Sequence, residues 1–388
     1  MSERQVLICN AGSTSLKFVL YDMPSENEIL QARIERIGDA SAPFSLKAGA
    51  QSYEREEAAV ADFETGIRLF MSAAATAGVT LRPDVIGFKT ALADTEGAAR
   101  RVDETVKAAM QTRLEVSPTH NKPYLDALAA LAECFPDVPQ VAVSETHFHA
   151  TIPEARRLYG VPLDWSETYG IKRYGYHGTS HRYISESLRA RYPDASHILS
   201  CHLGGSGSVS AILHGESVHN SFGFSLQSGV LHSRRSGQVD AFVFPFLLRR
   251  GFAAEQIETM LATQAGILGV SGISGDMRDI EEQLDLDPRA NLAFEVYLEH
   301  LLREIGSAYA VLGGLSDFVF TGGIGENSPL LRAHVIGRLG HFGLRLAEDR
   351  NIELPEDGRI DDGGCRIHVI RTNEELIVAR ETYQCQFS

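Results

Sequence analysis

The sequence contains few cysteines and no long apolar run. Its five cysteines are odd in number and scattered among 388 residues, unlike the paired spacing of a zinc ribbon or a disulfide framework. No apolar run approaches membrane-spanning length, and the start, MSERQVLICN, lacks a basic leader with an apolar core. These absences predict a soluble cytoplasmic protein with no membrane partner. Small buried apolar side chains are expected at Cys9, Cys134, Cys201, Cys365 and Cys385.

Basic residues are also in deficit. The chain has 36 Lys and Arg against 51 Asp and Glu, a formal net charge of −15, whereas a general nucleic-acid binder carries a basic footprint. We therefore expect no nucleic-acid partner. Anionic substrates remain compatible with this charge, because a few local Lys and Arg residues can dominate a cleft. The length suggests two or three domains, and a hydrophobic content of 44% is ample for large cores.

The most informative segment is residues 6–22, VLICNAGSTSLKFVLYD. Two apolar strands, 6–8 and 18–21, flank a tight turn in which Gly12 permits the required backbone conformations. Lys17 adds a point charge suited to phosphate oxygens, and a strand rather than a helix follows, unlike in a Walker or Rossmann turn. The segment predicts a phosphate clamp, although a plain hairpin with a polar tip fits it equally well. The hydroxyl donors would be Ser13, Thr14 and Ser15.

Two further glycine-rich turns follow strand patterns. Residues 198–213, ILSCHLGGSGSVSAIL, repeat the hairpin pattern, and residues 318–328, FVFTGGIGENS, place another turn after a buried strand. Each turn alone is a weak signal, because such turns occur in many α/β proteins. Three of one kind favour duplicated halves with a nucleotide cleft between two similar lobes.

The rest of the pattern is α/β. Residues 40–56 look polar and irregular, the SPTHNKP segment looks like a turn, and residues 151–170 are irregular and aromatic, the expected place for the first lobe to end. We expect helices at 57–78, 103–114, 124–134, 181–191, 255–263 and 291–312, and short strands at 85–88 and 140–143.

Eight motifs occur in order along nearly the whole chain: NAGSTSLKF, THNKP, RYGYHGTSH, CHLGG, RRSG, GVSGISGDMRD, FTGGIGENS and RTNEELIVARET. In this set and order the chain resembles the acetate/propionate kinase family, a branch of the sugar-kinase, heat-shock-ATPase and actin superfamily. The resemblance implies an α/β fold of two actin-like, ribonuclease H-like lobes, each with a mixed five-stranded sheet, and a nucleotide cleft between them. The first lobe would comprise residues 1–149 and 374–388, and the second 150–373. A homodimer through the second lobe is also implied.

The resemblance further implies a magnesium–nucleotide site for ATP and ADP. Asn10 matches an asparagine near the magnesium and Glu374 a glutamate that helps to hold it, and few protein carboxylates with several waters are usual for such sites. A solvated acid at a helix start is the alternative for Glu374. The implied nucleotide-binding residues are Ser13, Ser15 and Lys17 in the first turn, His202, Leu203, Gly204, Gly205 and Ser206 in the second, Asp276, Met277 and Arg278 beside the adenine, and Gly323, Ile324, Gly325, Glu326 and Asn327 in the adenosine-binding turn.

Catalytic roles are implied for His177, His120 and Arg235. Phosphoryl transfer to a carboxylate needs positive charge around an anionic transition state, and an arginine fork contacts carboxylate and phosphoryl oxygens together. A zinc site at His177 and His181 is the alternative for the HGTSH segment, and it is disfavoured because Gly178 indicates that His177 precedes the helix. His147 and His149, which flank Phe148, are a second candidate for a zinc site, and structural roles are favoured for them as well.

The chain departs from the family pattern at several positions. Lys89 replaces the substrate-contacting arginine of HRVVHGG, and Glu145 replaces the catalytic aspartate of FDTAFH, so each charge is kept while its reach changes. Gly205 and Ser206 replace the asparagine and glycine of HLGNG. The acyl pocket would be lined by Ala91, Thr119, Tyr176 and Leu226. A larger or more polar acid than acetate is therefore at least as well suited.

Three hypotheses follow. The first is a Mg-dependent kinase that interconverts ATP and a short carboxylate with ADP and an acyl phosphate by direct in-line transfer. The second is a nucleotide-binding relative with impaired transfer and a regulatory role, motivated by Lys89 and Glu145. The third is a kinase or hydrolase with another phosphoryl donor, such as pyrophosphate, made conceivable by the altered second turn.

Overall fold

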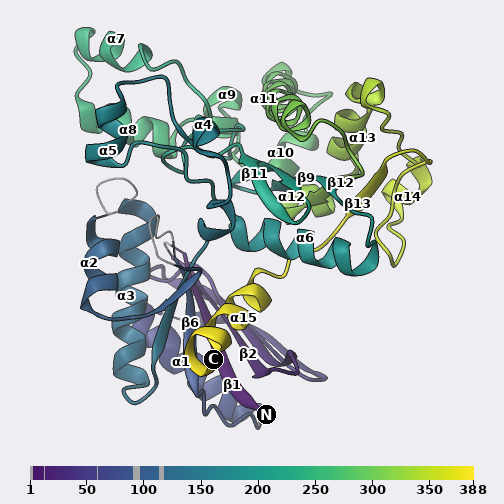
Figure 1. The fold of residues 1–388 in the computed structure, drawn as a ribbon. Coiled ribbons are helices and arrows are strands. Elements are labelled where there is room, and N and C mark those ends of the chain that lie inside the picture. The colour runs from purple at the N-terminus through teal and green to yellow at the C-terminus, as the bar shows by residue number, and fades with distance from the viewer. Residues whose placement is uncertain (1–2, 13, 59, 91–96, 113–117) are drawn as a thin grey trace. The chain divides into compact units, whose positions relative to one another are not determined.

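The computed structural model describes residues 3–12, 14–58, 60–90, 97–112 and 118–388. These residues form two compact units (Figure 1): the first unit is Met1–His147 with Asn373–Ser388, and the second unit is Phe148–Thr372. The first unit is therefore built from both ends of the chain.

The first unit contains a mixed sheet in the order β5-β4-β3-β2-β1-β6-β8-β7. Strands β1 to β5 pair antiparallel in sequence, while β1, β6 and β8 run parallel and β7 pairs antiparallel with β8. The strand bounds are β1 Arg4–Ala11, β2 Leu16–Met23, β3 Asn27–Ile34, β4 Ser41–Ala48, β5 Gln51–Ala58, β6 Val85–Thr90, β7 Ala99–Arg101 and β8 Gln140–Ser144.

Helices cover both faces of this sheet, because alternate side chains along a strand point to opposite faces. Val6 and Ile8 of β1 pack with Val378 of α15 (Glu374–Phe387), which lies beside β1 in Figure 1. Phe18 of β2 stacks on Phe70 of α1 (Phe63–Thr76), with ring centroids 4.2 Å apart. The remaining helices of the unit are α2 Glu104–Thr112 and α3 Pro118–Cys134.

Several local predictions for the first unit are wrong. Residues 41–58 form the β4–β5 hairpin, because Phe44 and Leu46 are buried at a spacing of two while polar neighbours fill the other face. Helix α1 begins at Phe63 rather than near residue 57, since Asp62 caps it by accepting a hydrogen bond from the Thr65 N–H. Helix α3 already begins at Pro118, so most of SPTHNKP is helical rather than a turn, consistent with proline being tolerated in a first helical turn.

The second unit contains a mixed five-stranded sheet in the order β11-β10-β9-β12-β13. Strand β9 pairs antiparallel with β10 and parallel with β12, just as β1 pairs with β2 and β6. The predicted duplication and α/β fold class are thus present, and the first sheet extends the five-stranded pattern to eight strands. The strand bounds are β9 His197–Leu203, β10 Gly207–Leu213, β11 Glu216–Asn220, β12 Asp317–Thr321 and β13 Arg366–Val369.

The second sheet is also covered on both faces. Leu199 and Ala211 pack with the long helix α11 (Pro288–Leu312), whereas Ile198 and Ile212 pack with α6 (Gly178–Arg191). The other helical segments are η2 His147–His149, α4 Glu154–Arg157, α5 Leu163–Tyr169, α7 Val243–Arg249, α8 Ala254–Thr263, α9 Gly266–Ser271, α10 Met277–Glu281, α12 Gly322–Asn327, α13 Pro329–Arg338, η3 Gly340–Phe342 and α14 Glu348–Ile352.

Two expectations for the second unit need correction. The stretch 151–170, expected to be irregular, contains the short helices α4 and α5. The GGIGEN segment, expected as a turn, is the single-turn helix α12, which begins directly at the end of β12. The predicted hairpin at 198–213 is confirmed as β9 and β10.

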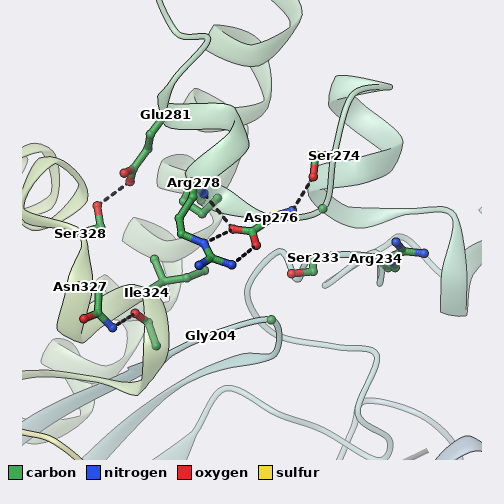
Figure 2. Close-up of a pocket in the computed structure, with 14 residues that line it drawn as sticks. Gly204, Ser233, Arg234, Ser274, Asp276, Arg278, Glu281, Ile324, Asn327 and Ser328 are labelled. Atoms are coloured by element: carbon green, nitrogen blue, oxygen red, sulfur yellow. Dashed lines mark hydrogen bonds and ion pairs between the residues drawn. The ribbon is translucent and has the colours of Figure 1, made fainter. Parts of the chain in front are cut away.

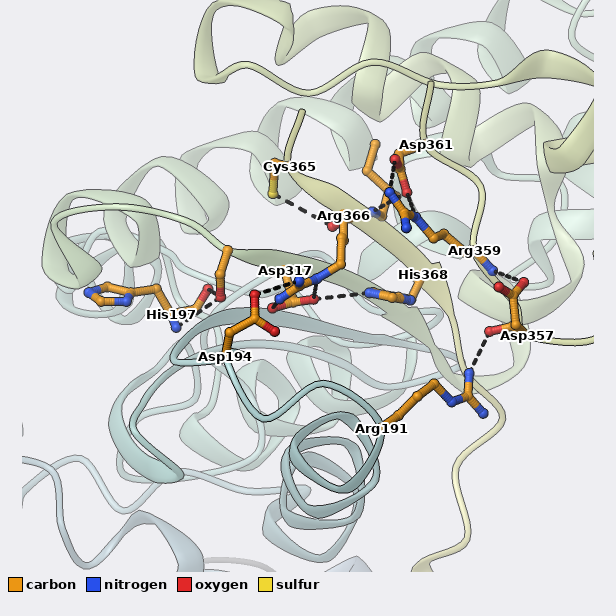
Figure 3. Close-up of polar contacts among 12 residues, drawn as sticks. Arg191, Asp194, His197, Asp317, Asp357, Arg359, Asp361, Cys365, Arg366 and His368 are labelled. Carbon is orange, nitrogen blue, oxygen red and sulfur yellow. Dashed lines mark hydrogen bonds and ion pairs between the residues drawn. The ribbon is translucent and has the colours of Figure 1, made fainter. Parts of the chain in front are cut away.

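A polar network fastens β13 to β12 (Figure 3). Arg366 donates two hydrogen bonds to the buried Asp317 carboxylate, at 2.6 and 2.9 Å, and a third to Asp194 at 2.8 Å. Burial alone would raise the pKa of Asp317, but hydrogen bonds from Arg366 and His368 outweigh it and lower this pKa well below its usual range. The network holds the sheet edge together and includes none of the predicted site residues.

The cysteine prediction is right only in part. Cys9 and Cys201 are buried, but Cys134, Cys365 and Cys385 are half-buried, and all five thiols are free. Among the described residues, none of the helices has both the length and the apolar character needed to cross a membrane.

Candidate active site

In the first unit, the opening hairpin places Asn10 directly opposite Lys17. The Lys17 Nζ lies 2.8 Å from Glu375 Oε1, and the Asn10 amide donates to the same oxygen at 2.9 Å. Because Glu375 lies at the start of α15, the C-terminal helix is tied to the hairpin through this carboxylate. Glu375 was missed at the sequence level, where nothing in TNEE shows which of the two acids faces the hairpin.

Beside this pair, Lys89 at the end of β6 contacts two carboxylates. Its Nζ lies 2.8 Å from Glu374 and 3.8 Å from Glu145, and the three side chains are 19%, 15% and 6% exposed. Burial opposes a charge on Lys89, but Glu374 and Glu145 outweigh burial and raise the pKa of Lys89 above its usual range. Burial, reinforced by Glu145, likewise raises the pKa of the neighbouring Tyr124 hydroxyl. The structure thus brings together Lys89 and Glu145, two of the residues that depart from the family motifs.

The oxygen atoms of this cluster fit a hard divalent cation. Asn10 Oδ1 is buried and accepts no hydrogen bond from the described residues, since the amide nitrogen alone serves Glu375. Glu374 adds a carboxylate in the same unit. Carboxylate and amide oxygens are the protein ligands that Mg²⁺ prefers. Asn10 and Glu374 therefore suit the metal role predicted for them.

Some predicted residues cannot be assigned contacts. Ser13 and Ala91 lie outside the described residues. Thr119 and His120 belong to the first turns of α3, and the described structure extends there to the backbone only. Ser15 lies in the turn of the opening hairpin, where its carbonyl accepts a hydrogen bond from the Gly12 N–H at 2.8 Å.

In the second unit, a cavity of about 590 Å³ is lined by the glycine-rich segments that the sequence singled out (Figure 2). It lies among the β9–β10 turn, the start of α10 and the helix α12. Of the predicted nucleotide residues, the following line it: Gly204, Gly205, Asp276, Met277, Arg278, Gly323, Ile324 and Asn327. The lining residues that were not predicted are Ser233, Arg234, Ser274, Gly275, Glu281 and Ser328. All of these except Ser233 and Glu281 lie within the quoted motifs.

Close backbone contacts assemble this cavity. Gly322 has a positive φ of 77°, and a Cβ there would lie 2.7 Å from the Leu203 carbonyl oxygen, so only glycine lets α12 begin against the end of β9. A Cβ on Gly275 would similarly lie 2.9 Å from the Ser233 carbonyl oxygen. Asp276 caps α10 and accepts a bidentate hydrogen-bond pair from the exposed Arg278 guanidinium, at 3.1 and 2.6 Å.

Other predicted nucleotide residues of this unit do not line the cavity. Leu203 is fully buried, and His202 accepts or donates a hydrogen bond with Ser180 at 2.8 Å. Glu326 accepts hydrogen bonds from the N–H groups of Gly322 and Thr372. It thereby links α12, part of the cavity wall, to the segment after β13. Ser206 and Gly325 are likewise absent from the lining.

A second group surrounds the buried ring of Phe222. This ring packs against Tyr176 and His177, with centroids 5.5 and 5.3 Å away. Arg235 Nη1 donates to the Leu226 carbonyl at 2.7 Å, while the Tyr176 hydroxyl donates to the Phe224 carbonyl at 3.2 Å. The segment after Phe222 therefore joins the predicted residues Tyr176, His177, Leu226 and Arg235. Phe222 itself carried no sequence signal.

His177 precedes α6, as predicted, with an uncommon positive φ of 56° for a non-glycine residue. Its Nδ1 lies 3.0 Å from Ser208 Oγ, which also lies 2.8 Å from His181 Nε2, and His181 Nδ1 lies 2.9 Å from Ser200. Burial holds the pKa of His181 well below its usual value. Both His181 nitrogens are thus engaged by serine hydroxyls, which supports the structural interpretation over a zinc pair.

The His149 nitrogens are engaged in the same way, by Ser217 at 2.7 Å and by the Tyr176 carbonyl at 3.0 Å. Burial lowers the pKa of His149 to about 3, so the ring is neutral at pH 7. The HFH segment therefore contributes a neutral buried histidine to the network around Tyr176.

Known proteins resemble this chain over nearly its whole length. The model of the Acetokinase family matches residues 5–380. The chain is 39% identical to a propionate kinase of Citrobacter rodentium over 97% of this chain and 96% of that protein, and 37% identical to an acetate kinase of Symbiobacterium thermophilum over 97% and 98%. A propionate kinase structure from Francisella tularensis aligns with a TM-score of 0.91 at 27% identity, covering 99% of this chain and 100% of that one.

The fold is that of an actin-like phosphotransferase. The chain belongs to the Acetokinase family, and it is therefore a kinase with a carboxyl group as phosphoryl acceptor.

Proposed function

We propose that this protein interconverts ATP and a short-chain carboxylate with ADP and an acyl phosphate, assisted by Mg²⁺. The observation that carries the proposal is the second-unit cavity, which is lined by three glycine-containing segments and by Ser233 and Arg234, directly before Arg235. Backbone N–H groups and small residues of this kind suit a nucleotide, and the adjacent arginine suits the group to be transferred.

In the proposed reaction, a carboxylate oxygen forms a bond to the γ-phosphorus as the bond to the bridging oxygen of ADP breaks. ADP retains that electron pair, and the acyl phosphate leaves. Because this transition state is planar and anionic, catalysis depends on positioning and on positive charge. Arg235 is proposed to bridge the carboxylate and phosphoryl oxygens, and His177 to donate a hydrogen bond to the phosphoryl group. Ser208 would hold the His177 ring through Nδ1.

The residues of the first unit are proposed to serve the same reaction. Asn10 and Glu374 would hold Mg²⁺, which when bound neutralises phosphate charge. Lys89 is the one cation that these ion pairs give to Glu145 and Glu374, so with both acids ionised the three groups carry one net negative charge. Lys17 is proposed to contact phosphate, and His120, Thr119 and Ala91 to contact the substrate. Their arrangement toward the acyl group stays a prediction.

The identity of the acid is a further part of the proposal. Tyr176 and Leu226 are buried, and the Tyr176 hydroxyl is hydrogen-bonded to Phe224. With Ala91 where the family commonly has valine, this set favours an acid at least as large as propionate. The preference is expected to be modest, since one methylene changes discrimination by about 1 to 3 kcal/mol.

A hydroxamate trap for acyl phosphate tests the function directly. With ATP, Mg²⁺ and a panel of acids from formate to valerate, at least one acid should yield an acyl hydroxamate, and Arg235→Ala should lower kcat about 1,000-fold, the scale of a transition-state arginine. Arg345→Ala, an exposed arginine outside the cavity lining, is the matched control. The absence of any hydroxamate from the wild-type protein would refute the proposal.

The same hydroxamate assay tests whether Lys89 and Glu145 adapt the enzyme to a larger acid or impair it generally. If Lys89 and Glu145 are adapted to a larger acid, Lys89→Arg with Glu145→Asp should raise kcat/KM for acetate relative to that for larger acids. Equal gains for every acid would instead indicate general impairment. Calorimetry with ADP and a trap with pyrophosphate as donor test the alternatives of nucleotide binding alone and of another donor, neither of which the comparisons favour.

A homodimer through the second unit and a cytoplasmic location complete the proposal. Support for the dimer comes from large apolar side chains exposed on α5, α7 and the residue before α7. Phe242 is 79% exposed and Tyr169 69% exposed. Sedimentation of the full chain at micromolar concentration should give twice the mass of one chain.

A further inference from the structure

A second, larger cavity lies within the second unit, apart from the one proposed for the nucleotide. Its volume is about 850 Å³, and it shares none of the lining residues of the first cavity. It is lined by residues of α4 and of the loops on either side of α5, by the segments 224–229 and 236–241, and by the C-terminal half of α11. None of the residues with a proposed role in the reaction lines this cavity.

Positive charge dominates this second cavity. Arg156, Arg173 and Arg303 line it together with a single acid, Glu304. Within the described part of the chain, none of the three arginines has a carboxylate at ion-pair distance. Arg156 donates to the Val218 carbonyl and Arg173 lies over the Tyr159 ring, 4.7 Å from its centroid. Arg173 acts electrostatically on Glu304, but three arginines against one acid leave this concave wall an excess of positive charge, which suits an anion with more than one negative group.

Two further polar groups in the wall need partners. His219 Nε2 and Gln227 Oε1 are buried, and neither has a hydrogen-bond partner among the described residues. Burial, together with Arg173 and Arg156, lowers the pKa of His219 to about 4, so the ring is neutral at pH 7. Buried polar groups are normally satisfied, so these two atoms leave the wall with unused hydrogen-bonding capacity.

The expected catalytic arginine lies between residues that line the two cavities. Ser233 and Arg234 line the first cavity, Ser236 and Gly237 line the second, and Arg235 lies between them in sequence. Arg235 in turn donates to the carbonyl of Leu226, whose two neighbours, Ser225 and Gln227, line the second cavity.

This wall has little freedom to absorb a displacement. Gly237 has a φ of 70°, and a Cβ there would lie 2.6 Å from the Val230 carbonyl oxygen. The Gln238 N–H donates to the Gly229 carbonyl at 3.2 Å, which ties segment 236–241 to segment 224–229. The Tyr176 hydroxyl contacts the same wall at Phe224. Close packing of this kind transmits a shift at one surface to the other.

We propose that the second cavity is an effector site for a small polyanion, with two or three carboxylate or phosphate groups, whose binding changes the position of Arg235. Arg303, Arg173 and Arg156 hold the charged groups, with His219 and Gln227 in the wall beside them. Binding rests only on this cavity, whereas the effect on rate rests also on the proposed function.

Calorimetry decides the binding half. Tricarballylate, succinate and inorganic pyrophosphate are titrated into the full chain, each with saturating ADP and acetate, which separates this cavity from the reaction site. We expect a dissociation constant below 1 mM for at least one probe, weakened at least tenfold in Arg303→Gln and unchanged in Arg345→Gln. Arg303 is exposed, so its replacement leaves folding intact. No binding by any probe, displacement by ADP or acetate, or equal affinity in Arg303→Gln would overturn the site.

The rate of acyl hydroxamate formation decides the coupling half. A saturating probe that binds should change kcat at least twofold in the wild-type protein and in Arg345→Gln, and not in Arg303→Gln. Binding without a change in kcat refutes the coupling to Arg235 and leaves the site. A wild-type protein that binds the probe but forms no hydroxamate refutes the proposed function and leaves the binding half standing.

Discussion

In the first unit the polar cluster at the ends of β1 and β6 is built on ion pairs, whereas in the second unit the cluster beside β9 and β10 is built on histidine–serine hydrogen bonds. Lys17, Lys89 and three carboxylates form ion pairs in the first unit. In the second unit, histidine nitrogens meet serine hydroxyls. Both sheets have the same strand pattern, so a duplicated fold does not dictate how buried polar groups are satisfied.

Ion pairs and neutral hydrogen bonds differ in how much stability is lost when one partner is removed. A partly buried ion pair leaves a large penalty when one partner is removed, whereas a neutral hydrogen bond is worth about 1 kcal/mol. Keeping carboxylates charged in a partly buried cluster is therefore costly, and in the first unit Lys17 and Lys89 offset this cost by pairing with them. The second unit keeps His149, His181 and His232 neutral by burial.

The largest effect is expected from Lys89→Met. Removing the ammonium leaves Glu145 and Glu374 buried without their cation, so the free energy of unfolding should fall by about 3 kcal/mol, as for a broken buried pair. Millimolar Mg²⁺ should restore more stability to this variant than it adds to the wild type. Urea denaturation with and without Mg²⁺ measures both effects.

Lys107→Met is the matched control for this variant. Lys107 pairs with Glu104 on the surface of α2, with side chains 46% and 91% exposed, and such a pair is worth less than about 1 kcal/mol. Equal losses in the two variants would show that burial in the Lys89 cluster has no energetic consequence.

The second prediction concerns the neutral histidines. The folded pKa is about 3 for both His149 and His232, with burial as the main cause, against about 6.5 in the unfolded chain. Since the folded value is lowered, stability is complete above about pH 6.5 and is lost as the pH falls toward 3, at up to about 1.4 kcal/mol per pH unit for each histidine.

Urea denaturation between pH 7 and pH 4 checks this loss. His149→Gln should make the pH dependence shallower by up to about 1.4 kcal/mol per pH unit, and His232→Gln should do the same. The exposed His341→Gln serves as the control and should leave the slope unaltered. A slope that is the same in all four proteins contradicts the neutral state of the two histidines.

The smallest effect is expected from Ser208→Ala. This change removes the hydroxyl shared by His177 and His181, so we expect a stability loss of about 1 kcal/mol. It should also lower kcat about tenfold with little change in the KM for ATP, because a 1 Å misplacement can cost even more. Thermal denaturation and the hydroxamate assay measure the two effects.

Ser210→Ala separates positioning from general damage. Ser210 is equally buried on β10, but its hydroxyl donates to the His219 carbonyl rather than to the His177 network. It should lose a similar amount of stability while kcat is retained. If kcat falls equally in both variants, Ser208 has no specific role toward His177.

Local patterns were sufficient to predict much of the fold. The strands at 6–8, 18–21 and 198–213 were found because their alternating or continuous apolar residues and the glycine turns between them are local properties. The β4–β5 hairpin was missed because its exposed face is rich in charge, which masked the period of two at Ala42, Phe44 and Leu46.

The site was predictable to a similar extent. The glycines and the Asp276–Arg278 segment of the second-unit cavity lie within motifs, so their grouping was found. Glu281 and Phe222 lie in no motif, and only tertiary packing places them at the cavity and beneath His177.

The sequence by itself determined the family, the two glycine-rich hairpins and the identity of the charged residues. Only the tertiary structure decided which acid meets which partner: Asn10 bonds to Glu375 across 365 positions, and Lys89 to Glu374 across 285. Adjacent glutamates at the start of a helix are nearly equivalent in sequence. They differ once the helix packs on a sheet, because successive side chains on a helix point in directions about 100° apart.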